Sequence, residues 1–107
     1  MRTVLVAFGL IVFAIVVFAG DQRKAKTHTI AIEGMRFQPE VLTVERGDII
    51  VWVNKDLVPH TATSKAGNFD SKLIEANKSW NYTVRTKGDF AYICTFHPTK
   101  KAMLRVE

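Results

Sequence analysis

The sequence predicts an all-β domain folded as a β-sandwich and preceded by an apolar segment. Apolar residues recur with period two in several short runs, turn residues separate these runs, and the chain lacks the 3.6-residue apolar period of a long helix. Fewer than 90 residues follow the apolar segment, which is enough for one domain. Short alternating runs in so small a domain are typical of an antiparallel β-sandwich.

The N-terminal segment, residues 1–19, indicates export. Arg2 is followed by the apolar run VLVAFGLIVFAIVVFA, and the chain then turns polar at GDQRKAK. This order is typical of a secretory signal peptide. An uncleaved membrane anchor is the alternative, although 16 apolar residues fall short of the roughly 20 that a span needs. Both interpretations place the rest of the chain outside the cytoplasm. We expect residues 20–27 to be a charged tether and residues 28–107 to form the domain.

The strands follow in order along this domain. The first alternates around Ile30 and Ile32, and the second is the VLTV run at residues 41–44. After a Gly47–Asp48 turn, the run DIIVWVN is apolar on both faces, which predicts a central buried strand. A single helical turn fits best between Phe69 and Asn77. The inward positions of the last three strands are Trp80, Tyr82 and Val84, then Phe90, Tyr92 and Cys94, then Ala102, Leu104 and Val106.

The charge of the chain excludes a nucleic-acid-binding role. The net charge is +5, and it would be about +4 without Arg2. The basic residues are dispersed, with no long basic run and no aromatic-basic repeat, so the pattern does not fit a nucleic-acid interface. A modest positive charge is compatible with acidic protein partners.

Cys94 is the single cysteine of the chain and cannot form an internal disulfide. A free thiol outside the cytoplasm is a liability unless a ligand or a reaction occupies it. His97 follows three residues later, and His60 follows the central strand. Because loops collect at the two poles of a sandwich, His60 can meet the Cys94–His97 loop. His28 begins the first strand beside the tether, and we expect it at the surface without a metal role.

Three kinds of site use cysteine and histidine together. Structural zinc usually requires four ligands with paired cysteines, and that pattern is absent from the sequence. A cysteine–histidine nucleophile pair requires a cleft and an oxyanion hole, which a domain of this size rarely provides. One thiolate and two imidazoles, with a weak axial ligand, form blue-copper electron-transfer sites. A buried cysteine with two surface histidines remains the structural alternative.

Three sequence blocks bear on this choice: GMRFQPEVLTVERGDIIVWVNKDLVPHTAT, GNFDSKLIEANKSWNYTV and GDFAYICTFHPTKKAMLRVE. In order and spacing they resemble the cupredoxins, specifically the plastocyanin and amicyanin type. The resemblance implies an eight-stranded Greek-key sandwich that holds one copper ion, cycling between Cu(I) and Cu(II), through His60, Cys94 and His97.

The resemblance also implies supporting roles around the copper. Thr61 and Thr95 would tie the two ligand loops together near the thiolate, and Asn54 would brace the His60 loop. We expect His97 to be the electron port within an apolar patch, and Trp52 and Trp80 to lie in the core. The patch residues implied by the family are Met35, Phe37, Val58 and Pro98, although the core is the more natural place for Phe37.

The axial ligand departs from the family pattern. Relatives carry a methionine shortly before the last strand, and the count back from Leu104 places Lys100 there. Met103 shares the strand face of Arg105 and Glu107, opposite the inward Leu104, so we expect it to point away from the copper. A protonated lysine cannot bind a metal, so Lys100 would have to lose its proton to do so. Two alternatives stay open: a distorted loop that brings Met103 to the copper, and a site without a strong axial protein ligand.

The sequence therefore predicts an exported type 1 copper protein that carries single electrons between redox partner proteins and is not itself an enzyme. It would meet a membrane only through an uncleaved N-terminal segment, and a periplasmic location fits this interpretation. Two alternatives stay open. The chain could bind copper for delivery or sequestration without redox turnover, or it could be a structural module that has lost its metal.

Overall fold

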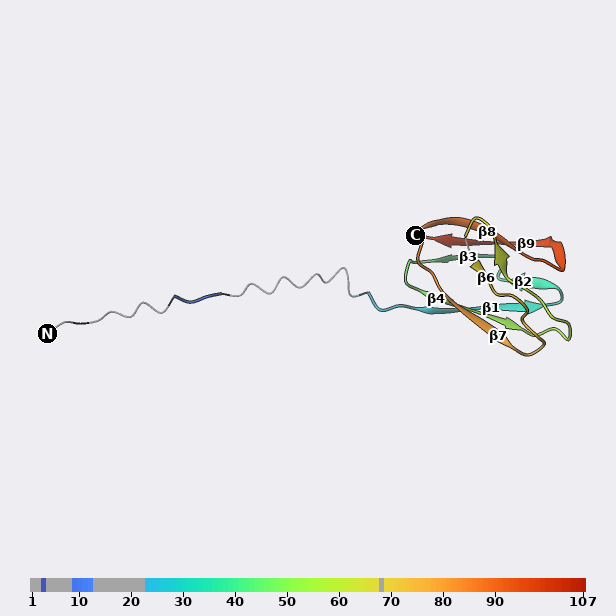
Figure 1. Ribbon diagram of the computed structural model, residues 1–107, viewed down its shortest axis with the longest axis horizontal. Helices are drawn as coiled ribbons and strands as arrows, with labels where there is room; N and C mark the ends of the chain where they lie inside the picture. Colours follow the sequence, from blue (N-terminus) through green and yellow to red (C-terminus); the bar gives the residue numbers. More distant parts are fainter. Residues whose placement is uncertain (1–2, 4–8, 13–22, 68) are drawn as a thin grey trace.

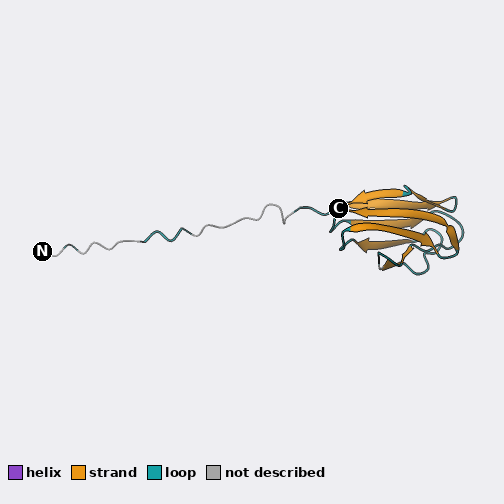
Figure 2. Cartoon of the chain, turned by 90° about the horizontal axis from the view of Figure 1, so that it is seen from above, coloured by secondary structure: helices purple, strands orange, loops and turns teal. Residues whose placement is uncertain are grey.

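The computed structural model describes residues 3, 9–12, 23–67 and 69–107, so most of the expected signal or anchor segment lies outside the described residues. The domain is a sandwich of two β-sheets, seen from two directions in Figures 1 and 2. Within the described residues there are nine strands and no helix, and therefore no helix long and apolar enough to cross a membrane. The all-β sandwich predicted from the sequence is confirmed.

The first sheet has the strand order β2-β1-β4-β7. Its strands are β1 (Thr27–Glu33), β2 (Arg36–Gln38), β4 (Ile49–Asn54) and β7 (Ser79–Thr83). β4 is the central buried strand expected from its apolar run, and it lies between β1 and β7. β1 pairs with β4 in parallel, so the sheet is mixed and the expectation of a purely antiparallel sandwich is wrong.

The second sheet has the order β3-β9-β8-β5-β6 and is also mixed, because β3 runs parallel to β9. Its strands are β3 (Val41–Val44), β5 (Thr63–Ser64), β6 (Phe69–Asp70), β8 (Gly88–Cys94) and β9 (His97–Val106). The helical turn expected between Phe69 and Asn77 is absent, because β6 and an isolated bridge at Ile74 occupy that stretch. The short strands β2, β5 and β6 were not predicted.

Contacts with the sandwich begin before residue 28, the expected start of the domain. Thr27 already pairs with Ile49 in β1, and Arg23 forms an ion pair with Asp48, a buried carboxylate at the start of β4. Residues 23–27, at the C-terminal end of the expected tether, therefore contact the sandwich, and residues 20–22 lie outside the described part. Asp48 anchors this end of the fold because it also accepts hydrogen bonds from the backbone N–H of Lys26 and Glu45.

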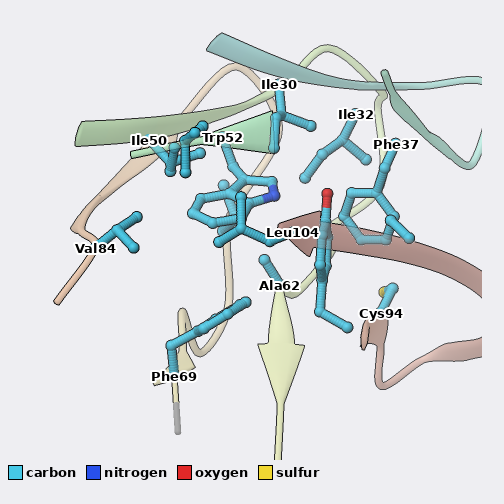
Figure 3. Close-up of a cluster of buried hydrophobic side chains, with 14 of the residues drawn as sticks. Ile30, Ile32, Phe37, Ile50, Trp52, Ala62, Phe69, Val84, Cys94 and Leu104 are labelled. Carbon is cyan, nitrogen blue, oxygen red and sulfur yellow. The ribbon is translucent and has the colours of Figure 1, made fainter. Parts of the chain in front are cut away.

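The core lies between the sheets and surrounds Trp52, which is fully buried (Figure 3). Tyr92 packs edge-on against Trp52, with ring centroids 5.6 Å apart, and against Phe37 at 4.7 Å. Such edge-to-face aromatic pairs add roughly 0.5–1.5 kcal/mol beyond their buried area. Because Tyr92 precedes Cys94 by two residues on the same face of β8, these contacts fix the end of the strand that carries the cysteine.

Candidate metal centre

His60, Cys94 and His97 come together at one end of the sandwich, as the sequence predicts. Cys94 ends β8 and His97 begins β9, where the two residues pair across the strands. His60 lies six residues beyond β4 and is held by two backbone hydrogen bonds with Ile74, of 3.0 and 2.8 Å. Figure 1 shows that β9 starts at the end of the sandwich away from the C-terminus.

The buried part of this centre is the pair formed by His60 and Cys94. The Cys94 Sγ lies 3.6 Å from the His60 Nδ1, and both residues are almost fully buried. The His97 ring is partly exposed, and its centroid lies 5.6 Å from that of His60. In the described part of the chain, no three His, Cys, Asp or Glu side chains already form a cluster that could hold a metal ion. The geometry thus brings two of the three candidate ligands into direct contact, with His97 beside them at the surface.

The separation of these two atoms fits a shared metal ion. A zinc-sized ion bonds imidazole nitrogen at about 2.0–2.1 Å and thiolate sulfur at about 2.3 Å, so one trigonal ion would separate the two atoms by about 3.8 Å. The observed separation of 3.6 Å is close to this value. A soft thiolate next to imidazole is also the donor combination that suits copper.

Asp56 determines which nitrogen of His60 is free to bind a metal. Its carboxylate Oδ2 lies 2.8 Å from the His60 Nε2. An ionised carboxylate only accepts hydrogen bonds, so we assign the ring proton to Nε2, which leaves the lone pair of Nδ1 facing Cys94. Burial alone would raise the pKa of Asp56, but hydrogen bonds from the backbone N–H of Met35 and Gly34 and from His60 lower it. The sequence analysis missed Asp56, whose only signal is its position four residues before a candidate ligand.

Two threonines connect the ligand loops, as expected. The backbone N–H of Thr61 points at the Cys94 Sγ at 3.4 Å. The Thr61 hydroxyl oxygen accepts a hydrogen bond from the backbone N–H of Thr95 at 2.9 Å and lies 3.2 Å from the Thr95 hydroxyl. A backbone donor aimed at the sulfur is the kind of contact that supports a metal-bound thiolate, so Thr61 is placed to support Cys94 as a ligand.

Asn54 braces the His60 loop, which also confirms the expectation. Its side-chain amide is fully buried and donates to the carbonyls of Val58 at 2.8 Å and Ile74 at 2.9 Å. Its carbonyl oxygen accepts the backbone N–H of Asp56 at 2.9 Å. One side chain therefore fixes both the loop before His60 and the segment that bridges His60.

Comparison with known proteins agrees with this fold. A family model described as "Cupredoxin-like domain" matches residues 5–106, nearly the whole chain. The chain belongs to the cupredoxin-like family. Amicyanin-alpha from Methylorubrum extorquens is 26% identical over 94 residues, which cover 83% of this chain and 79% of the relative.

Solved structures show the same fold. An amicyanin variant in its Cu(I) form aligns with a TM-score of 0.70 at 22% identity, covering 76% of this chain and 82% of that one. A copper-containing nitrite reductase from Thermus scotoductus aligns with a TM-score of 0.71 at 24% identity. The match covers 76% of this cupredoxin but only 22% of the reductase chain.

The exposed edge of His97 lies in an apolar depression. The depression has a volume of about 300 Å³ and is lined by Met35, Val58, Pro59, Phe96 and His97. We call this surface the port. Two of the residues expected in the patch, Met35 and Val58, belong to it. Phe37 is instead buried in the core, and the exposed Pro98 is not part of the lining.

Phe96 is the port residue that the sequence analysis missed. Its ring is 55% exposed, an unusual position for so large an apolar side chain. The sequence feature that could have predicted its place in the port is its position directly before His97.

The register of β9 separates Met103 from the metal centre. Met103 pairs with Ala91 of β8 and Val41 of β3, six residues along β9 from His97. Ala91, its partner in β8, lies three residues before Cys94, which is roughly 10 Å of strand at about 3.3 Å per residue. Its neighbours Ala102 and Leu104 are buried on the opposite face, as the alternation predicts.

Lys100 does not behave as an axial ligand either. The pairing of β8 with β9 jumps from Ile93↔Lys101 to Cys94↔His97, so residues 98–100 form a bulge on β9. Lys100 is exposed and lines a second hollow, whose lining includes none of the three candidate ligands. The expectation that Lys100 stands over the metal is not supported by this placement.

His28 lies outside the metal centre. Its Nε2 is 2.9 Å from the Oδ2 of Asp48, the buried carboxylate that anchors the start of β4. The ring is therefore hydrogen-bonded within the fold at the start of β1, at the end of that strand away from the metal centre. It is not one of the candidate metal ligands.

Proposed function

We propose that this cupredoxin is an exported type 1 copper protein that carries one electron at a time between redox partner proteins, with His60, Cys94 and His97 as its copper ligands. The observation that carries the proposal is the buried pair of His60 Nδ1 and Cys94 Sγ, 3.6 Å apart beside a partly exposed imidazole. Copper bound there supplies the one-electron Cu(I)/Cu(II) couple.

The residues of the chain give this site the properties of a carrier. Asp56 and Asn54 hold His60, and the Thr61 N–H holds the sulfur, so little rearrangement is needed when the charge changes. The buried pair leaves little room for a small substrate, whereas the port exposes the edge of His97 to another protein. This arrangement supports electron transfer through His97 rather than catalysis.

The proposed export rests on the sequence. Residues 1–19 would act as a cleaved signal peptide or as a membrane anchor, which places the domain in the periplasm or an equivalent compartment. Such a compartment also explains why the lone Cys94 needs an occupant.

The test is the visible spectrum of the purified full chain after one equivalent of Cu(II) is added. An intense thiolate-to-copper charge-transfer band is expected for wild type, and Cys94→Ser should abolish it while keeping the size of the side chain. Thr99→Ser, at an exposed position of β9, is the matched control and should keep the band. An equally intense band in Cys94→Ser would refute the assignment of the ligands.

Copper delivery is a second candidate function, favoured by one observation. His97 is partly exposed in the port, so a partner protein or a chelator could reach a metal bound there. If Cu(I) passes to a bathocuproine chelator within seconds while electron self-exchange is slow, delivery replaces the carrier role. A chain that binds neither Cu(I) nor Cu(II) would instead be a structural module that has lost its metal.

A further inference from the structure

A second hollow of about 340 Å³ carries a concentration of positive charge. It is lined by Arg36, Phe37, Glu40, Thr99, Lys100 and Lys101. All three cations are exposed, and none takes part in the ion pairs found among the described residues. Glu40 is the one carboxylate in the lining. The hollow therefore presents more positive than negative charge to solvent.

This cationic hollow is adjacent to the port. Arg36 directly follows Met35 of the port, and Thr99 lies two residues after His97. The three-residue bulge at residues 98–100 carries Lys100 out of the regular strand pairing. The departure from the family pattern at Lys100 thus places a cation beside the electron port instead of a ligand on the metal.

We propose that an acidic redox partner protein docks on this combined face, with its carboxylates in the cationic hollow and its apolar contact on the port. The inference deepens the proposed carrier function and rests on it. Opposite charges beside a contact site steer partners together and set their orientation. A second copy of this chain is a poor occupant, since each copy carries a net charge of +5.

The experiment follows electron transfer from the reduced, copper-loaded full chain to two small oxidants of opposite charge. Hexacyanoferrate(III) represents an anionic partner, and tris(phenanthroline)cobalt(III) represents a cationic one. For Lys100→Gln/Lys101→Gln, the rate with hexacyanoferrate(III) should fall roughly 3- to 10-fold at low salt. Lys87→Gln removes one charge from a different hollow, lined by Arg23 and Glu107, and should change the rate little.

Poly-L-glutamate and phosphatidylglycerol vesicles provide the second measurement, made on the copper-free chain. Poly-L-glutamate should bind wild type and the Lys87→Gln chain, and it should bind the double variant more weakly. Equal binding by all three chains, or equal oxidation rates, would overturn the proposal. Tighter, lysine-dependent binding to the vesicles would replace the protein partner with a membrane. If the copper-loaded chain shows no charge-transfer band, the carrier function is refuted. The poly-L-glutamate measurement then decides by itself whether acidic proteins bind the cationic hollow.

A hydrogen-bond chain on the other side of Thr61 carries a second, independent inference. The Thr63 hydroxyl lies 3.1 Å from the Thr61 hydroxyl oxygen and 3.1 Å from the Asp70 Oδ1. A hydroxyl has one proton to donate, and an ionised carboxylate can only accept, so Thr63 donates to Asp70. The Thr61 hydroxyl oxygen is the second acceptor within reach of the Thr63 hydroxyl, and it also accepts the backbone N–H of Thr95.

We infer that Asp70 and Thr63 are positioning residues for the metal centre. Asp70 holds the Thr63 hydroxyl, the Thr63 hydroxyl contacts the Thr61 side chain, and the Thr61 N–H is thereby kept on the Cys94 sulfur at 3.4 Å. Asp70 itself is fixed by the backbone N–H of Lys72 at 2.9 Å. A surface carboxylate of β6 would in this way influence the thiolate without touching it.

Two variants of the copper-loaded full chain test this role. Thr63→Val and Asp70→Asn should shift the energy of the charge-transfer band and lower the reduction potential, because a weaker N–H···S contact stabilises the reduced site less. Thr63→Ser restores the hydroxyl and should restore both values, and Asp89→Asn on exposed β8 is the charge control. In the copper-free chain, the Thr61 amide should exchange with solvent faster in Thr63→Val. The inference would be overturned if Thr63→Val changed neither the energy of the charge-transfer band, nor the reduction potential, nor the exchange rate of the Thr61 amide.

Discussion

Replacing Asn54 with alanine should destabilise the domain by about 2–4 kcal/mol. The substitution removes two donors and one acceptor that satisfy the carbonyls of Val58 and Ile74 and the N–H of Asp56. A buried polar group left without a partner costs roughly 1–3 kcal/mol. Ile74 is buried, whereas Val58 is exposed, so water can replace part of the loss.

Urea unfolding of the copper-free full chain measures this change as a lower midpoint at constant slope. Asn81→Ala, on the exposed face of β7, is the matched control and should cost less than about 0.5 kcal/mol. A loss below about 1 kcal/mol in Asn54→Ala would show that the loop finds other partners, and the bracing argument would fail. In the folded variant, copper affinity should also fall about 10- to 100-fold, as for other groups that orient a ligand.

Three further predictions follow from contacts around and beyond the site. Met103→Leu should leave the spectrum of the copper-loaded chain unchanged, because the register of β9 keeps Met103 far from the ligands; a strong shift would mean that the β8–β9 pairing is wrong. Asp56→Asn should weaken copper binding about 10-fold in chelator competition, because a neutral amide supports the proton on His60 Nε2 less well. Burial would raise the pKa of Asp48, but its hydrogen bonds hold that pKa far below the usual range. Its contribution to stability is therefore complete above about pH 5 and is lost as the pH falls toward the folded-state pKa. In urea unfolding, the free energy of unfolding of Asp48→Asn should decline less steeply with falling pH than that of wild type.

Much of the fold was predictable because a strand with one buried face has a local signature. Alternation placed Ile30 and Ile32 in the core, and the same rule put Leu104 inward and Met103 on the opposite face. The run at residues 48–54 was correctly read as a central strand because both of its faces are apolar. The strands β2, β5 and β6 escaped prediction, since two or three residues are too few to show a period.

By itself, the sequence determined the period-two strands and the three residue types that suit a copper site. Only the tertiary structure decided that β1 pairs in parallel with β4, that Asp56 orients His60, and that a bulge moves Lys100 away from the metal centre. These features depend on which distant segments become neighbours. Strand alternation reflects the burial of a single segment, whereas a carboxylate reaches an imidazole, or a bulge forms, only when two sheets have closed around a common core.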